Sequence, residues 1–191
     1  MPDTSSLIRI EVQPPYTPQI GALVQMMRYA RMTTLQAVKG MTVAELDAIP
    51  PGFSNSVGML LAHIAAVDRM YHIFSFQGVN PYSTDDFRPY LGAISFGKRG
   101  ERVTGRSLEE LLAELESSRA ATLAELAKRD DAWLSTILTG WDDFQPDQHW
   151  AWFHVMEDEL SHRGQIRILR KALAQIAQEK EALQQKLTAQ E

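Results

Sequence analysis

The chain has 191 residues, 45% of them hydrophobic and 23% charged, which fits one globular domain and excludes wholesale disorder or a fibrous repeat. The formal net charge of −5 argues against nucleic acid as the main partner, because phosphate binding requires a concentrated basic face. The chain has no cysteine, which excludes disulfides and thiolate zinc sites, so any bound metal must have nitrogen and oxygen ligands.

The first predicted element is an N-terminal arm, residues 1–17. Residues 7–12 alternate briefly in the manner of a strand, but three prolines between residues 14 and 18 interrupt the pattern. Thr17 is a suitable helix N-cap followed by a proline at the first helical position. Apolar residues then recur at helical spacing as far as Gly40, which predicts the first long helix.

A short helical turn and a second long helix follow. Thr42 and Glu45 have the spacing of a capping box and predict a turn of helix that ends before the prolines at 50–51. Residues 54–56 offer another N-cap, and the dense apolar residues after them predict a helix from about 57 to 76 with a wide stripe toward the core.

Residues 77–106 form a long connection without sustained periodicity. Prolines and glycines interrupt it, and about thirty such residues are unusual inside a compact domain. Two interpretations stay open, a functional loop and a lid that is packed by its own aromatic residues. The aromatic residues in question are Tyr82, Phe87, Tyr90 and Phe96.

The C-terminal half supplies two further helices. Ser107 and Glu110 form a second capping box, and leucines at helical spacing predict a third long helix to about residue 129. Residues 130–145 are predicted to be a loop, and a fourth helix is predicted from about 147 to 187. Four amphipathic helices without a strand-rich segment predict an all-α fold, a four-helix bundle.

The bundle is expected to span residues 18–175 and to be followed by a helical extension, residues 176–191. Leucines and an isoleucine from the end of the bundle into this extension follow a rough heptad that Lys180 interrupts. Either this segment forms a homodimer or it is an exposed charged helix. The heptad residues are Leu169, Leu173, Ile176, Leu183 and Leu187.

The predicted fourth helix carries most of the candidate metal chemistry. His154, Asp158 and His162 are spaced i, i+4 and i+8, so they share one helical face. The two histidines are roughly 12 Å apart along the axis, too far to bind one ion together. Asp158 can pair with either of them, since residues one turn apart are separated by roughly 6 Å. A third ligand must come from another helix.

His63 is the candidate for that third ligand, because it lies among apolar residues on the inward stripe of the second helix. A buried imidazole requires a partner. That partner is either a metal ion or a hydrogen-bonding neighbour such as Asp158 or Glu157. His72 and His149 are predicted not to bind metal.

Two segments resemble a known family. Residues 50–63 resemble the entry into helix two, and residues 154–166, ending in His-Arg-Gly-Gln-Ile, resemble the helix-four signature of the DinB/YfiT-like superfamily of four-helix-bundle metalloenzymes. The resemblance covers roughly residues 18–175. It implies a divalent metal (zinc, nickel, iron or manganese) bound by three residues, His63, Asp158 and His162.

The sequence departs from the family at position 158, where aspartate stands in place of the usual histidine. Two histidines and one carboxylate remain a competent ligand set with open positions for water or substrate. Alternatively, the metal has been lost, and a metal-free, hydrogen-bonded cluster remains.

The resemblance also implies a chemistry. A bound metal would lower the pKa of a water, hydroxyl or thiol, and Glu157 or His154 would then orient the reacting group or accept its proton. Some relatives use a low-molecular-weight thiol, which implies a thiol-dependent S-transferase or a hydrolase-like enzyme acting on a small molecule. Arg99 and Arg102, with Lys98 and Arg106 beside them, could bind carboxylates of such a cofactor; otherwise they form a solvated basic loop.

The competing interpretation is a non-catalytic scaffold of a stress or damage response, with a vestigial metal site and the C-terminal helix as an interaction surface. The N-terminus lacks the features of a signal peptide, and no apolar stretch approaches the length of a membrane span. We therefore expect a cytoplasmic protein without a membrane partner.

Overall fold

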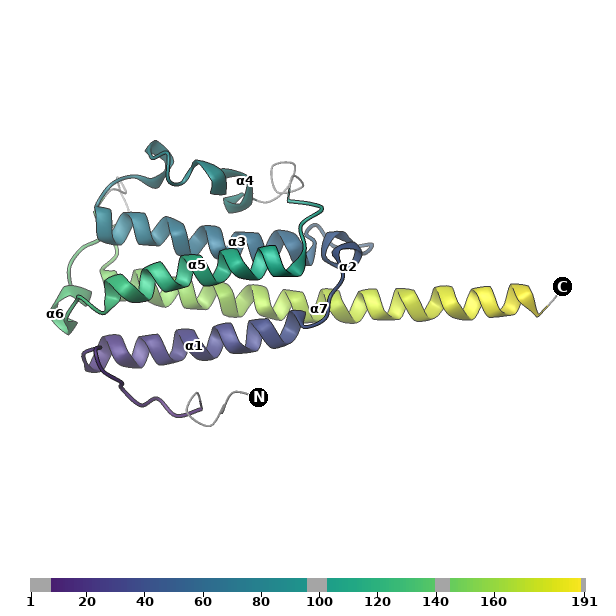
Figure 1. Ribbon diagram of the computed structural model, residues 1–191, viewed down its shortest axis with the longest axis horizontal. Helices are drawn as coiled ribbons and strands as arrows, with labels where there is room; N and C mark the ends of the chain where they lie inside the picture. The colour runs from purple at the N-terminus through teal and green to yellow at the C-terminus, as the bar shows by residue number, and fades with distance from the viewer. Residues whose placement is uncertain (1–7, 96–102, 140–144, 190–191) are drawn as a thin grey trace.

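The computed structural model describes residues 8–95, 103–139 and 145–189 (Figure 1). The predicted all-α fold is confirmed, and the described residues contain no strand beyond one isolated bridge between Ile137 and Asp147. The four longest helices are α1 (Pro18–Val38), α3 (Val57–His72), α5 (Leu108–Leu126) and α7 (Gln148–Thr188). Helix α3 packs against α5 and α7, and α1 packs against α7 and more lightly against α5, so the four helices form a closed ring.

The predicted helix starts are confirmed by hydrogen bonds. Reciprocal capping boxes begin α2 (Val43–Asp47) and α5, through Thr42 and Ser107 respectively. Asp147 caps α7 by accepting from the Trp150 backbone N–H at 2.7 Å. Thr17 precedes α1 as predicted, but its hydroxyl donates to Asp131 instead of capping the helix.

The connections are more ordered than the sequence pattern predicts. The second helix changes at His72 into a π-helical turn, η2 (Ile73–Gln77), and the segment expected to be a loop from residue 130 begins with α6 (Asp131–Leu134). The connection after η2 contains three short helices, η3 (Pro81–Ser83), η4 (Arg88–Tyr90) and α4 (Leu91–Ile94). Proline at an early helical position favours such turns in η3 and η4.

Aromatic packing holds this connection onto the bundle. Phe87 is completely buried, and its ring contacts Tyr82 and Tyr90 at centroid distances of 5.5 and 5.9 Å. Three of the four aromatic residues predicted to pack this segment therefore do so, while Phe96 lies outside the described residues. As a result, α4 lies against α3, on the side of α3 away from α1, as Figure 1 shows.

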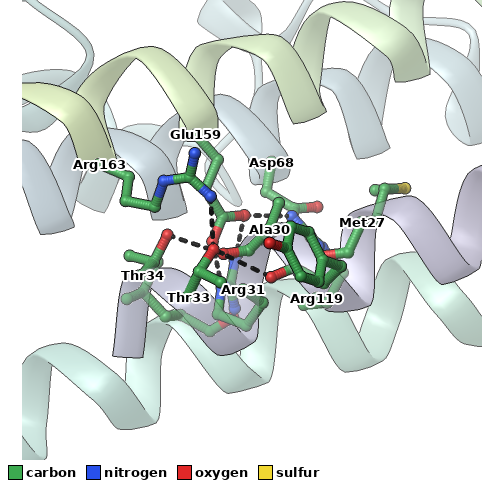
Figure 2. Close-up of polar contacts among 11 residues, drawn as sticks. Met27, Ala30, Arg31, Thr33, Thr34, Asp68, Arg119, Glu159 and Arg163 are labelled. Carbon is green, nitrogen blue, oxygen red and sulfur yellow. Dashed lines mark hydrogen bonds and ion pairs between the residues drawn. The ribbon is translucent and has the colours of Figure 1, made fainter. Parts of the chain in front are cut away.

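A buried network of charges joins all four long helices (Figure 2). It consists of Arg31 from α1, Asp68 from α3, Arg119 from α5 and Glu159 from α7. Arg119 donates to Asp68 Oδ2 at 2.6 Å and to Glu159 Oε2 at 2.9 Å, and Arg31 donates to Glu159 Oε1 at 2.8 Å. Thr122 of α5 donates to the other oxygen of Asp68 at 2.6 Å. Two guanidinium groups thus neutralise two carboxylates in the core.

The network satisfies its own polar atoms, which is the condition for burying charge at tolerable cost. The side chains of Asp68 and Glu159 are completely inaccessible, and that of Arg119 is 5% exposed. The arginines also donate to the backbone carbonyls of Leu115 and Met27. Because each long helix contributes to the network, it fixes how the helices are rotated relative to one another.

The last part of α7 projects beyond the bundle, as the yellow end of the ribbon in Figure 1 shows. Leu169 is 2% exposed, whereas Leu183 and Leu187 are 60% and 54% exposed. None of the described helices combines the length and the apolar composition required to span a bilayer.

We predict that Arg119→Met lowers the free energy of unfolding by about 3–5 kcal/mol, because it leaves buried carboxylates without their cation. The matched control is Arg88→Met, which breaks the Arg88–Asp85 pair, whose side chains are 77% and 90% exposed, and should cost less than about 1 kcal/mol. Urea denaturation measures both values. Equal losses in the two variants would show that the network does not hold the helices together.

Candidate metal centre

Three predicted ligand residues converge between α3 and α7. His63 comes from α3, while Asp158 and His162 lie one turn apart on α7. The distance from Asp158 Oδ1 is 3.7 Å to His63 Nε2 and 3.2 Å to His162 Nε2. One ligand atom from each residue lies within 4.8 Å of the other two. Helix α7 supplies the pair because residues at i and i+4 share a face, and α3 supplies the residue opposite.

Both imidazole rings are oriented through the nitrogen farther from the cluster. His63 Nδ1 donates to the backbone carbonyl of Ala93 in α4 at 3.0 Å, and His162 Nδ1 lies 3.3 Å from Gln165 Oε1. The rings meet edge to face with centroids 4.9 Å apart. In a neutral ring, a proton held on Nδ1 leaves the lone pair on Nε2 for a cation, whereas in a protonated ring Nε2 donates to Asp158. Histidines that bind metal are usually oriented in this way.

The electrostatics keep Asp158 ionised. Burial raises the pKa of its carboxyl, but hydrogen bonds and charge interactions with His162 and His63 outweigh this effect and lower the pKa to about 2. For His162 both effects have the opposite sign. Burial lowers the pKa of the imidazole, but the bond to Asp158 outweighs burial and raises the pKa above its ordinary value. The carboxylate is therefore available as a ligand at neutral pH.

The residues fit a divalent cation. Asp158 Oδ2 is buried and has no hydrogen-bond partner among the described residues, although a buried carboxylate oxygen ordinarily has one. His63 and His162 are each 8% exposed, so the cluster lies just below the surface. Two imidazoles and a carboxylate suit zinc, iron, nickel or manganese, and three protein ligands leave positions open for a small molecule.

His154 and Glu157 lie beside the cluster on α7: His154 is one turn before Asp158, and Glu157 directly precedes it. His154 Nδ1 is 3.0 Å from Glu157 Oε2. The ring of His154 stacks on Trp150 with centroids 4.9 Å apart and packs edge-on against Tyr71 at 5.7 Å. The pKa of Tyr71 is raised by burial and by the negative charge of Asp158. This pair of ionisable side chains, His154 and Glu157, thus shares its surroundings with the candidate ligands.

The other predicted site residues do not join the cluster. His72 packs against Phe76 and His149 is exposed, and neither is among the three clustered residues. Arg99 and Arg102, with Lys98, lie outside the described residues, so their predicted role in binding a thiol cofactor stays a prediction. Arg106 pairs with Glu114 of α5.

A groove of the described residues lies elsewhere on the bundle. It has a volume of about 500 Å³ and is formed by the N-terminal arm, α1 and the face of α7 that carries Met156 and Leu160. Asp158 lies between these two residues in sequence and points to the other side, because successive helical residues are about 100° apart. The groove is therefore not the entrance to the candidate metal centre.

The chain was compared with protein families, solved structures and curated proteins. The sequence matches the family described as mycothiol S-transferase over residues 22–175. A solved structure described as a conserved protein from Enterococcus faecalis is 16% identical, with a TM-score of 0.63, and the match covers 78% of this chain and 94% of that one. At that identity the likeness supports the fold alone. A comparison with curated proteins finds no match.

In metal-free protein, we predict that Asp158→Asn lowers the pKa of His162 and costs more stability at pH 5.5 than at pH 9. The pKa of His162 is raised in the folded state, so the stabilisation is fully present below the unfolded value and is lost as the pH rises through the folded value. Imidazole NMR titration and urea denaturation at both pH values provide the measurements. The control is Glu181→Gln on the exposed extension, which should leave both quantities unchanged.

Proposed function

Because this chain belongs to the mycothiol S-transferase family, we propose that it is a divalent-metal-dependent enzyme that transfers the sulfur of a low-molecular-weight thiol, mycothiol, to an electrophilic small molecule. His63, Asp158 and His162 are the proposed ligands. The observation that carries the proposal is the convergence of their ligand atoms within 4.8 Å of one another, at positions on two different helices.

The proposed reaction breaks the S–H bond of the thiol and forms a bond from sulfur to an electrophilic carbon. The thiol proton passes to a base, and the leaving group of the second substrate departs with its electron pair. When bound, the metal supplies Lewis acidity that lowers the pKa of the thiol. The protein must hold the two substrates together, orient them and accept the proton.

His154 is the proposed proton acceptor, with Glu157 as its orienting partner. Glu157 accepts from Nδ1 at 3.0 Å, which leaves the basic lone pair on Nε2. His154 lies one helical turn, roughly 6 Å along the axis, from Asp158. The stacked indole of Trp150 fixes the plane of the imidazole, and Trp150 itself is 37% exposed, so it offers an aromatic surface to an incoming small molecule.

Aspartate at position 158 supports a retained site more than a lost one. A carboxylate that served only to hydrogen-bond two histidines would have no need to leave Oδ2 buried without a partner. The carboxylate also makes the ligand set one unit more negative than three histidines would. We therefore propose that the charge of the bound cation is more fully compensated here than in relatives with three histidines.

The first test of the proposal is the metal content of protein purified without a histidine tag or chelator. We expect about one equivalent of a divalent metal in the wild type and its loss in both His63→Ala and Asp158→Ala, because each substitution removes one of three ligands. His149→Ala, at an exposed position of α7, is the control and should keep the metal. A wild type that neither contains nor takes up metal would rule out the proposed function.

A second test addresses His154 and Glu157. With mycothiol and an electrophilic acceptor, His154→Gln should lower kcat by roughly 10²-fold, and Glu157→Gln by less, because a positioned base typically contributes 10²–10⁴-fold. The metal content should remain that of the wild type, since neither residue is a proposed ligand. Unchanged kcat in His154→Gln at full metal occupancy would remove His154 from the mechanism.

A further inference from the structure

The projecting end of α7 carries an apolar stripe that nothing in the described part of the chain covers. The stripe continues the buried face of the helix: Leu169 is in the core, Leu173 and Ile176 are partly buried, and Leu183 and Leu187 are 60% and 54% exposed. From Leu173 to the end of α7 at Thr188, the stripe extends over sixteen helical residues, or roughly 24 Å. A solvated helix of this length is marginal on its own, so an apolar stripe along it indicates a partner.

The stripe has the spacing of a coiled coil. Its residues alternate by four and three, which assigns Leu173, Lys180 and Leu187 to position a and Ile176 and Leu183 to position d. The flanking g positions are Glu179 and Lys186, of opposite charge. The f positions, on the opposite side of the helix from the stripe, are Gln178 and Gln185.

We propose that this helix pairs with the same helix of a second copy of the chain, in an antiparallel coiled coil. In a parallel pair, residues at position a face each other, so Lys180 would meet its own copy across the seam. In an antiparallel pair position a faces position d, so Lys180 packs beside Leu183 of the second copy and extends its ammonium group to solvent.

Charge complementarity supports the same orientation. When Lys180 faces Leu183 of the other copy, the g positions face each other in pairs, and Glu179 of each copy lies opposite Lys186 of the other. The two-fold symmetry produces this ion pair twice. In a parallel pair Glu179 would lie opposite the uncharged Gln184 instead.

A groove where α7 leaves the bundle can receive the C-terminal end of the partner helix. The antiparallel register brings Leu187 of one copy opposite Ile176 of the other. Ile176 lines a shallow groove of about 240 Å³ together with Pro50, Pro51 and Glu179. Burial of the leucine against Ile176 and the two prolines removes from water a side chain that the single chain leaves 54% exposed.

The first experiment is sedimentation analysis of the full chain over about a hundredfold range of concentration. The wild type should reach twice the chain mass of 21.5 kDa. Leu183→Glu with Leu187→Glu should remain a monomer. Gln178→Glu with Gln185→Glu adds the same charge at position f and should dimerise as the wild type does. A monomeric wild type, or dissociation of both variants alike, would overturn the proposal.

The second experiment tests the orientation by exchanging charges. Glu179→Lys alone and Lys186→Glu alone should each weaken the dimer roughly tenfold, because two attractive pairs become repulsive. Together they should restore the wild-type dissociation constant within about twofold. Failure of the double variant to recover would overturn the antiparallel arrangement. Metal content serves as the control for folding of the bundle and should stay that of the wild type in every variant.

Discussion

The rest of the structure depends on two arginines and two carboxylates buried where the four long helices meet. Charged groups in a protein core are tolerated only in nearly fixed geometry, because any displacement leaves an ion without its counter-ion. Arg119 joins Asp68 to Glu159, and Arg31 holds Glu159 from the other side. With apolar packing alone, the helices could slide or rotate relative to one another at a small cost in the free energy of folding. The network makes one arrangement strongly preferred.

That preference extends directly to the candidate metal centre. Glu159 and Asp158 are consecutive residues of α7, and Asp68 lies little more than one turn from His63 on α3. Fixing Glu159 toward α1 and α5 therefore turns Asp158 toward α3, since successive helical side chains are about 100° apart. The buried ions set the rotation of both helices that supply the candidate ligands. The ligand atoms can then meet without an ion to gather them.

The sequence predicts the parts of this molecule whose signals are local. Capping boxes at Thr42 and Ser107 and apolar periodicity locate the helices, and the spacing of Asp158 and His162 brings two ligands onto one face. The π-helical turn η2 has no such signal, and the one signal of the short helix α6 is its N-cap Asp130, inside a segment whose pattern predicts a loop. Residues at the ends of long helices respond to tertiary packing more than to their own propensity.

The remaining parts of the site and of the charge network could not be predicted from the sequence, for different reasons. Ala93 contributes a backbone carbonyl, which every residue possesses. Arg31 and Arg119 look like solvated helix residues when taken singly. Glu159 offered a usable signal, because it lies seven residues after the buried Trp152, on the same helical face.

The hydrogen bond from His63 to Ala93 ties the proposed ligand to a segment remote in sequence. By thermodynamic reciprocity, a cation bound at Nε2 as proposed would strengthen the bond from Nδ1 to Ala93, so occupancy of the proposed site and the docking of α4 on α3 would rise together.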